Sequence, residues 1–294
     1  MNTSELTFPS NIMTDIERHF VSTLEENYPK EEIHQFVMML CEAYLGWDTT
    51  QYLLHRQEPI NQSDLLKFHW ALEDLKRNRP IQHIIGHTFF CGCTIRVDEN
   101  VLIPRPETEE MVNFILKLFH GKAPKSIADL CTGSGCIAIA LAKFFPLATI
   151  HATDLSEAAL KVAQTNATDN RVDIAFRKED LLDHKEGMTQ YDLIVSNPPY
   201  ICQKEIAEMR PNVLQYEPHT ALFVEDSDPL IFYRALAHYA TFQLGDDGVL
   251  VTEINEHLGE ETRAVFQNCG FEAQIHQDFR GKERWIIARK MEKQ

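Results

Sequence analysis

The chain lacks any long uncharged apolar run, although 44% of its 294 residues are hydrophobic. No segment approaches the ~18 apolar residues that a membrane-spanning helix needs. A basic-then-apolar secretory signal is also missing, because the first 30 residues carry five acidic side chains, namely Glu5, Asp15, Glu17, Glu25 and Glu26. We therefore expect a protein of the cytoplasm that does not bind membranes.

Basic charge is scarce as well. The chain has 28 Lys and Arg against 44 Asp and Glu, a formal net charge of −16, and residues 1–79 alone carry 7 basic and 13 acidic side chains. Proteins that hold duplex nucleic acid non-specifically neutralise phosphates with Lys and Arg. The composition therefore disfavours direct nucleic-acid binding, although a local basic patch stays possible.

The seven cysteines do not form a recognisable set. An odd, scattered group in a long chain is not typical of a disulfide framework. Cys91 and Cys93 lack a second nearby pair of Cys or His, which disfavours zinc or any other metal site. We expect free thiols, and the chain shows no Ser-His-Asp pattern.

The organisation of the chain is that of two domains joined by a linker. Residues 1–80 have helical periodicity, with Gly46 predicted to stop one helix, Ser63 to cap another and Pro80 to end it. Residues 81–106 are predicted to be a linker with a β-hairpin around Gly92. Residues 107–294 alternate between strand-like and helix-like segments.

This alternation predicts crossover units and a mostly parallel sheet, so the fold class is α/β. The expected strands are residues 126–130, 149–153, 172–176, 191–196, 248–254, 272–276 and 284–288, and the expected helices include 137–145 and 157–167.

A glycine-containing segment follows the first expected strand, and it reads Asp129-Leu-Cys-Thr132-Gly133-Ser134-Gly135. Such a turn lets the backbone approach a ligand and leaves helix N–H groups free. It matches neither a Walker loop nor the G-x-G-x-x-G dinucleotide pattern. By itself it is equally compatible with a tight strand–helix turn.

Acids at the next two strand ends favour a nucleoside ligand. Asp154 lies 21 residues after Gly133, where doubly wound nucleotide binders place an acid on the ribose hydroxyls. Asp180 follows the third strand, in a position suited to an adenine amino group. This order resembles that of class I S-adenosylmethionine methyltransferases.

The fourth strand ends in Asn197-Pro198-Pro199-Tyr200. The two prolines remove backbone donors and stiffen the segment, while their carbonyls stay as acceptors. An Asn side-chain oxygen beside a carbonyl can accept both hydrogens of one –NH₂ group, and Tyr200 can cover a planar substrate. Such positioning favours attack of a weakly nucleophilic nitrogen on a sulfonium methyl group. DNA, rRNA and protein-glutamine methyltransferases all share this motif.

Further segments narrow the resemblance. They are Pro80–Gly86, Val101–Glu109 with Arg105-Pro106-Glu107, Tyr216–Phe223, Gly270-Phe271 and Asp278–Arg284. Together with the two motifs above, they make the chain similar to the release factor glutamine methyltransferase family (PrmC/HemK) from about residue 10 to residue 290.

The resemblance implies a seven-stranded Rossmann-like methyltransferase sheet, with a helical domain at 1–80 that docks the substrate. The implied activity is methylation of the glutamine side-chain amide in the Gly-Gly-Gln motif of class I peptide chain release factors. The methyl donor would be S-adenosyl-L-methionine, with S-adenosyl-L-homocysteine as product, and the enzyme would be a monomer. Two rival readings are an amino-methylating DNA or rRNA enzyme and a catalytically silent S-adenosylmethionine-binding adaptor.

The resemblance also implies roles for single residues. Asn197, Pro198, Pro199 and Tyr200 would bind the glutamine amide, with Arg105 and Glu107 beside them, unless Arg105 makes only a structural ion pair. The cofactor would be held by Asp129, Thr132, Gly133, Ser134, Gly135, Asp154, Asp180 and Asn197.

Three positions depart from the family pattern. Cys131 replaces a glycine, which is tolerable if its φ is negative, so we expect an intact but slightly crowded site. Asn255 replaces another glycine, and as the best non-glycine residue in left-handed backbone it could preserve that turn. His83 stands where tyrosine is common, and we expect it to pack rather than catalyse.

Overall fold

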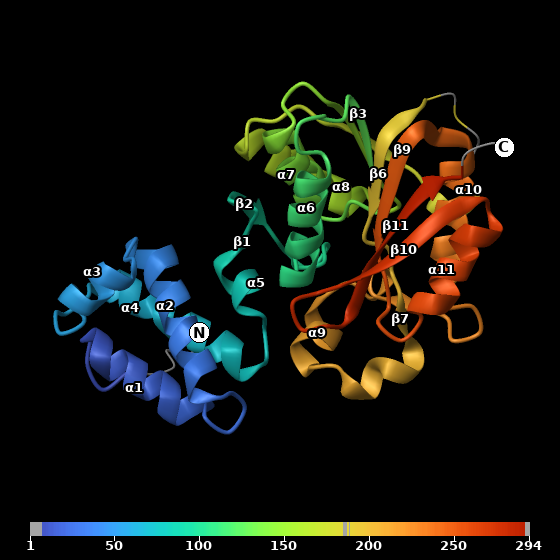
Figure 1. Ribbon diagram of the computed structural model, residues 1–294. Coiled ribbons are helices and arrows are strands. Elements are labelled where there is room, and N and C mark those ends of the chain that lie inside the picture. Colours follow the sequence, from blue (N-terminus) through green and yellow to red (C-terminus); the bar gives the residue numbers. More distant parts are fainter. Residues whose placement is uncertain (1–7, 185–186, 188, 292–294) are drawn as a thin grey trace. The chain divides into compact units, whose positions relative to one another are not determined.

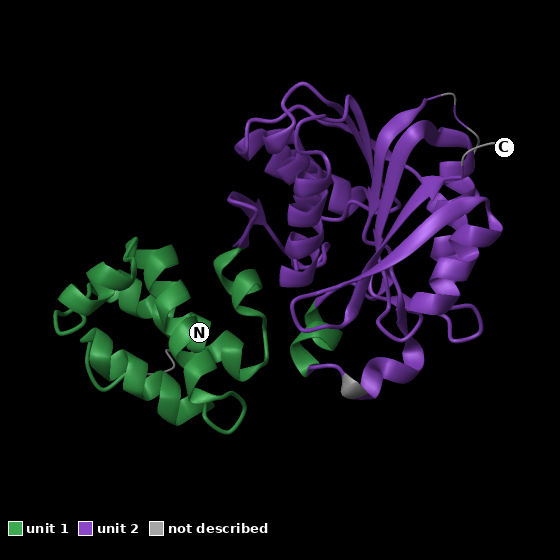
Figure 2. Ribbon diagram, viewed as in Figure 1, with its two compact units in different colours: residues 1–86, 211–216 green, residues 87–210, 217–294 purple. Residues whose placement is uncertain are grey.

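The computed structural model describes residues 8–184, 187 and 189–291. The chain divides into two compact units, residues 1–86 with 211–216 and residues 87–210 with 217–294 (Figure 2). Residues 1–7 of the predicted N-terminal domain lie outside the described part. Within that part, no helix is both long and apolar enough to cross a bilayer.

The first unit is helical (Figure 1). Its helices are α1 (Met13–Leu24), α2 (Lys30–Leu45), α3 (Thr49–His55), α4 (Gln62–Lys76), α5 (Ile81–Ile85) and α9 (Pro211–Tyr216). Apolar side chains at helical spacing, such as Ile16, Phe20 and Leu24 of α1, are fully buried in one core. The buried His83 belongs to this unit, as a packing role requires.

Two details of this unit differ from the sequence prediction. The cap of α4 is Asn61 rather than Ser63, because the Asn61 Oδ1 accepts the backbone N–H of Asp64 at 2.9 Å. Helix α3 was not predicted, and it begins at a reciprocal capping box between Asp48 and Gln51. Gly46 ends α2 in the left-handed conformation, as predicted.

The second unit contains a seven-stranded sheet in the order β10-β11-β9-β6-β3-β4-β5. Its strands are β3 (Ser126–Leu130), β4 (Thr149–Asp154), β5 (Ala175–Lys178), β6 (Tyr191–Ser196), β9 (Leu244–Glu253), β10 (Phe271–Gln277) and β11 (Glu283–Lys290). The first five are parallel to one another, whereas β11 pairs antiparallel with both β9 and β10. The predicted α/β class and methyltransferase-type sheet are therefore confirmed.

Helices cover both faces of this sheet (Figure 1). Helices α6 (Pro106–Leu118), α7 (Cys136–Phe144) and α8 (Glu157–Asp169) share one apolar core with it. Helices α10 (Ile231–Gln243) and α11 (Gly259–Asn268) share the core on the other face. A buried central sheet of this kind needs apolar residues on both faces, which explains why most residues of β3 and β6 are apolar and buried.

The remaining strands are short. The predicted hairpin is present as the antiparallel pair β1 (His87–Phe90) and β2 (Cys93–Arg96), and β7 (Ile201–Cys202) pairs with β8 (Phe223–Val224). The third strand of the sheet in chain order, predicted at residues 172–176, is β5 and begins three residues later, at Ala175. Residues 172–176 have the right alternation, but pairing with β4 begins only at Ala175, since the Val172 N–H still bonds to the Ala167 carbonyl at the end of α8.

Candidate functional site

Strands β3, β4 and β6 end at the same edge of the sheet, where their loops surround a cavity of about 370 Å³. Parallel sheets bind ligands at this edge. The cavity is lined by most of the residues predicted from sequence, namely Arg105, Thr132, Gly133, Ser134, Asp154, Asp180, Asn197 and Pro199. The other predicted site residues, Glu107, Asp129, Gly135, Pro198 and Tyr200, are not part of its lining.

The loop between β3 and α7 forms one wall. Gly133 and Gly135 both have positive φ, at 54° and 80°, and Gly135 is the N-cap of α7. A Cβ at Gly135 would lie 3.0 Å from the Ala163 Cβ, so only glycine lets α7 and α8 pack this closely. The backbone of Gly133 is thereby brought to the wall of the cavity.

Asp129, in strand β3, stabilises the loop between β3 and α7 by hydrogen bonds. Its buried carboxyl accepts the Thr132 hydroxyl at 2.6 Å and the Ala138 N–H at 3.1 Å through Oδ2. Its Oδ1 is buried without a hydrogen-bond partner among the described residues. Burial raises the pKa of Asp129 to about 7 against the opposing effect of these two hydrogen bonds.

Cys131 does not meet the condition set for it from sequence. Its φ is +61°, in the left-handed region that glycine adopts without strain. The expectation of a negative φ is therefore wrong, and the loop keeps its shape despite the Cβ. Burial, and then the carboxylate of Asp154, raise the pKa of the Cys131 thiol, so it stays protonated at neutral pH.

Asp154 closes the loop from the end of β4. Its Oδ2 accepts the Gly133 N–H at 2.8 Å, and its Oδ1 accepts the Ser156 N–H at 2.9 Å. A carboxylate has about four acceptor positions. Two backbone bonds therefore leave capacity for the two hydroxyls of a ribose.

The part of the cavity beside the ends of β4 and β5 has apolar walls. Leu155 and Leu182 line it, with 58% and 45% of their surfaces exposed. Asp180 lies beside them and accepts the Leu182 N–H at 2.9 Å. Apolar faces next to a carboxylate suit a heteroaromatic base with an exocyclic amino group, and sequence reasoning did not identify the two leucines.

Asn197 is tied to two residues that sequence reasoning did not assign to the site. Its Nδ2 donates to the Thr108 Oγ1 at 3.1 Å, and the Thr108 hydroxyl donates to the Glu253 Oε2 at 2.6 Å. The Tyr200 hydroxyl donates to the other oxygen of Glu253 at 2.6 Å. Burial raises the pKa of Glu253, while these two hydroxyls and Arg284 oppose that effect.

Arg105 makes the structural ion pair that the sequence analysis named as an alternative. It lines the cavity and pairs with Glu217, with 2.6 Å between its Nη2 and the Glu217 Oε1. The Glu217 side chain is 1% exposed and its other oxygen accepts the Ile103 N–H at 3.0 Å. The ion pair thus fixes the segment that leads into α6. Glu107 lies in the first turn of that helix.

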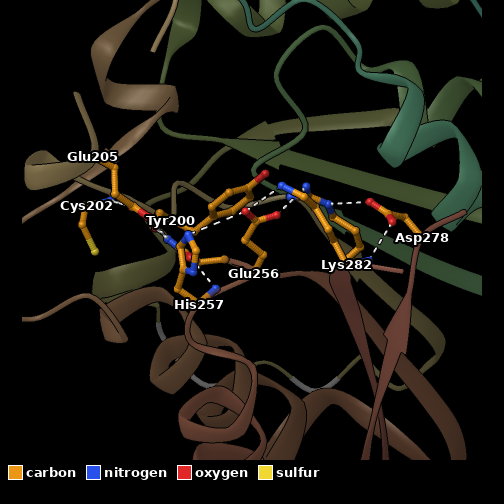
Figure 3. Close-up of polar contacts among 9 residues, drawn as sticks. Tyr200, Cys202, Glu205, Glu256, His257, Asp278 and Lys282 are labelled. Carbon is orange, nitrogen blue, oxygen red and sulfur yellow. Dashed lines mark hydrogen bonds and ion pairs between the residues drawn. The ribbon is translucent and has the colours of Figure 1, made fainter. Parts of the chain in front are cut away.

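Asn255 adopts another role than the sequence suggested. It is not among the residues with positive φ, so the expected left-handed turn is wrong. The side chain is instead buried, and its Nδ2 donates to the Tyr200 carbonyl at 3.1 Å and to Glu205 at 3.0 Å (Figure 3). Glu205 also accepts the Cys202 N–H at 2.6 Å. The Asn255 side chain therefore fixes the C-terminal end of the Asn-Pro-Pro-Tyr segment through the Tyr200 carbonyl.

A charged cluster follows Asn255 in sequence. Arg284 bridges Glu256 at 2.8 Å and Asp278 at 2.9 Å, and Lys282 pairs with Glu256 at 2.9 Å (Figure 3). The Asp278 side chain is fully buried, and its hydrogen bonds with Lys282 and Arg284 lower its pKa. The cluster joins β11 to the loop after β9.

Comparison with known proteins agrees with this geometry. Residues 107–215 match the family model of the methyltransferase small domain, and residues 15–86 match that of the PrmC N-terminal domain. A release factor glutamine methyltransferase from Flavobacterium psychrophilum is 41% identical over 91% of this chain and 95% of its own length. One from Bacteroides thetaiotaomicron is 38% identical over 94% of this chain and 99% of its own.

The chain belongs to the release factor glutamine methyltransferase family. A methyltransferase structure from Pyrococcus furiosus matches with a TM-score of 0.50 and 18% identity over 68% of this chain and 90% of that one, a likeness of fold alone. The chain is thus a methyltransferase, as the sequence predicted, and the resemblance to this family is confirmed.

The positions that sequence reasoning missed carried weak signals. Thr108 lies within the quoted Arg105–Glu109 segment, and Glu253 ends an apolar strand, where a buried carboxylate is unexpected. Leu155 directly follows the predicted ribose acid. The position of each residue in the sequence could have suggested a role in the site, but the sequence does not show which residues each one contacts.

Proposed function

We propose that this chain transfers a methyl group from S-adenosyl-L-methionine to the side-chain amide nitrogen of the glutamine in the Gly-Gly-Gln motif of class I peptide chain release factors. The names of its relatives, at up to 41% identity, support the substrate. The observation that carries the proposal is that the Asn-Pro-Pro-Tyr segment adjoins the cavity of about 370 Å³ that Asp154 and Asp180 line, with Asn197 and Pro199 in the same lining.

The residues of the cavity fit the methyl donor. Asp154 would hold the ribose hydroxyls with its two remaining acceptor positions, and Asp180 would accept from the adenine amino group. Leu155 and Leu182 would cover the base, and the loop from Thr132 to Gly135 would hold the amino-acid end, braced by Asp129. When bound, the donor supplies an electrophilic methyl group on a sulfonium and leaves as S-adenosyl-L-homocysteine.

The chain's own contribution is to orient a poor nucleophile. The Asn197 side-chain oxygen and the Pro198 carbonyl would accept the two hydrogens of the glutamine –NH₂ group, while Pro199, Tyr200 and Arg105 would form the walls of the pocket. Such fixed acceptors favour the nitrogen losing its amide conjugation as its lone pair attacks. The proton released afterwards passes to water, so no group of perturbed pKa is required.

The remaining expectations follow from this substrate. We propose that the enzyme works as a monomer in the cytoplasm, where release factors act, and that it does not bind nucleic acid directly. The net charge of −16 supports the last point, because phosphate contacts need basic side chains.

The test is a methyl-transfer assay with labelled donor. The full chain is incubated with a class I release factor, with the same factor carrying Ala in place of the motif glutamine, and with DNA and rRNA fragments. We expect label on the intact factor alone and its loss in Asn197→Ala. Asn268→Ala, at an exposed position at the end of α11, is the matched control.

The possible results separate the candidate functions. Label on nucleic acid would overturn the proposal in favour of an amino-methylating DNA or rRNA enzyme. Donor binding without label on any substrate would indicate a catalytically silent adaptor. Label on a release factor that lacks the motif glutamine would contradict the proposed acceptor site.

A further inference from the structure

We infer that Thr108 and Glu253 are positioning residues that decide which end of the Asn197 side-chain amide meets the substrate. They turn its oxygen, not its nitrogen, toward the incoming –NH₂ group. This inference rests on the proposed function, because it assigns a cause to the acceptor role of Asn197.

The first step concerns the two hydroxyls on Glu253. Tyr200 and Thr108 each lie 2.6 Å from one of its oxygens, within the range of charge-assisted O–H···O⁻ bonds. Burial raises the pKa of Glu253, and the two hydroxyls, followed by Arg284, oppose that effect. Each hydroxyl lies on a different oxygen of Glu253, so the carboxylate accepts both hydroxyl protons.

The second step concerns the single proton of Thr108. A threonine hydroxyl has one hydrogen to donate and two lone pairs that accept. With its hydrogen bound to Glu253, Thr108 can only accept from Asn197, so the group 3.1 Å from its Oγ1 must be the Asn197 –NH₂. The amide oxygen and nitrogen could otherwise be exchanged by a flip of the side chain.

The third step concerns the consequence for the substrate. The nitrogen of Asn197 is engaged by Thr108, so its oxygen is the end left to accept a hydrogen from the substrate. The opposite orientation would set two –NH₂ groups against each other, donor to donor. The two groups proposed to accept the substrate hydrogens are then both oxygens, the carbonyl of Pro198 and the side-chain amide oxygen of Asn197.

The Glu253 carboxylate also stabilises Tyr200, the last residue of the Asn-Pro-Pro-Tyr motif. Glu253 holds the Tyr200 hydroxyl, and Asn255 binds the Tyr200 carbonyl at 3.1 Å. Thr108 of α6 and Tyr200 from the segment after β6 therefore meet at Glu253, which lies at the end of β9. Thr108 alone among them sets the direction of the Asn197 amide.

The test compares Thr108→Val with Thr108→Ser. Valine keeps the shape but removes the acceptor, so we expect kcat for the release factor to fall on the order of 100-fold, the effect of losing one preorganised polar contact. The Kd of the donor, measured by calorimetry, stays within about twofold, as for an unchanged cofactor site. Serine restores the hydroxyl and should restore kcat.

The control is Thr165→Val, at an exposed position of helix α8 that also carries a threonine. A folded Thr108→Val enzyme with wild-type kcat would overturn the inference. So would a Thr108→Ser enzyme as impaired as the valine variant, because a merely structural loss would not depend on the hydroxyl.

A second measurement needs neither activity nor a folded Thr108 variant. In the full chain labelled with ¹⁵N-asparagine, the Asn197 –NH₂ signals are assigned by their loss in Asn197→Ala. We expect at least one of the two hydrogens to exchange slowly with water, since it is bound to Thr108. Fast exchange of both would overturn the inference, whereas absence of label on release factor would overturn the proposed function alone.

Discussion

At the scale of single residues, the loop between β3 and α7 holds a cysteine in left-handed backbone. Cys131 sits at a φ of +61° and packs on the core beneath α10. Left-handed backbone costs an L-residue with a Cβ about 1–2 kcal/mol. The loop therefore carries local strain that the surrounding hydrogen bonds of Asp129 and Asp154 must hold in place.

This strain predicts an inverted order of stability for substitutions. At most positions alanine is more stable than glycine by roughly 0.5–1 kcal/mol. At Cys131 we expect Cys131→Gly to be more stable than Cys131→Ala by about 1 kcal/mol, because both lose the thiol but only glycine relieves the strain. Urea denaturation of both variants measures the difference, and an alanine variant as stable as the glycine variant would contradict the left-handed assignment.

The buried Asp129 gives a second prediction, on pH. Its pKa of about 7 exceeds that of an exposed aspartate, so between about pH 4 and pH 7 the folded protein binds a proton that the unfolded chain has released. The contribution of this residue to the free energy of unfolding therefore falls as the pH rises through that range.

The comparison with Asp129→Asn isolates this effect. We expect the stability of the wild type minus that of the variant to decrease from pH 4 to pH 7 in urea denaturation series. The control is Asp247→Asn, at an exposed position in β9. The stability of the wild type minus that of this control variant should not change between pH 4 and pH 7. Parallel curves for wild type and Asp129→Asn would mean that Asp129 is ionised throughout.

At the scale of elements, the loop after β9 is held by ion pairs as well as by the buried Ile254. Arg284 on β11 bridges Glu256 in that loop and the buried Asp278 in the β10–β11 turn. Because Asn255 precedes Glu256, the same loop reaches the carbonyl of Tyr200. Arg284, together with Lys282, thus links the C-terminal strand pair to the loop that contacts the Asn197–Tyr200 segment.

Removing this arginine should be costly. Arg284→Met leaves the Asp278 carboxylate, which has no exposed side-chain surface, without its cationic partner, and breaking such a buried pair costs about 3–5 kcal/mol. We expect a loss of that order in urea denaturation. Asp278→Asn in the same chain should recover part of it, whereas additive losses in the double variant would show that the two residues do not interact.

The prediction of elements from sequence succeeded where periodicity was strong. Strands β3 and β6 have the predicted bounds, Ser126–Leu130 and Tyr191–Ser196, because both are apolar runs closed by turn residues. Strand β5 was misplaced, since an edge strand that is mostly exposed carries little signal about where pairing begins. Helix α3 was missed because seven residues are too few for a clear period.

At the scale of the whole molecule, the sequence determined the fold class and the edge of the sheet that bears the cavity. Both depend on order along the chain, because parallel strands joined by crossover helices bring their carboxyl ends together whatever the details of packing. Asp154, Asp180 and Asn197 could therefore be placed at one site before any contact was known.

Only the tertiary structure decided how these residues are oriented. Thr108 and Glu253 are 145 positions apart, Arg105 and Glu217 112, and Asn197 and Thr108 89. Periodicity reports which face of an element is buried, but it carries no information on which polar groups meet inside. Buried polar groups must find hydrogen-bond partners once the elements pack. That requirement pairs Glu253 with the Tyr200 hydroxyl and determines the orientation of the Asn197 side-chain amide.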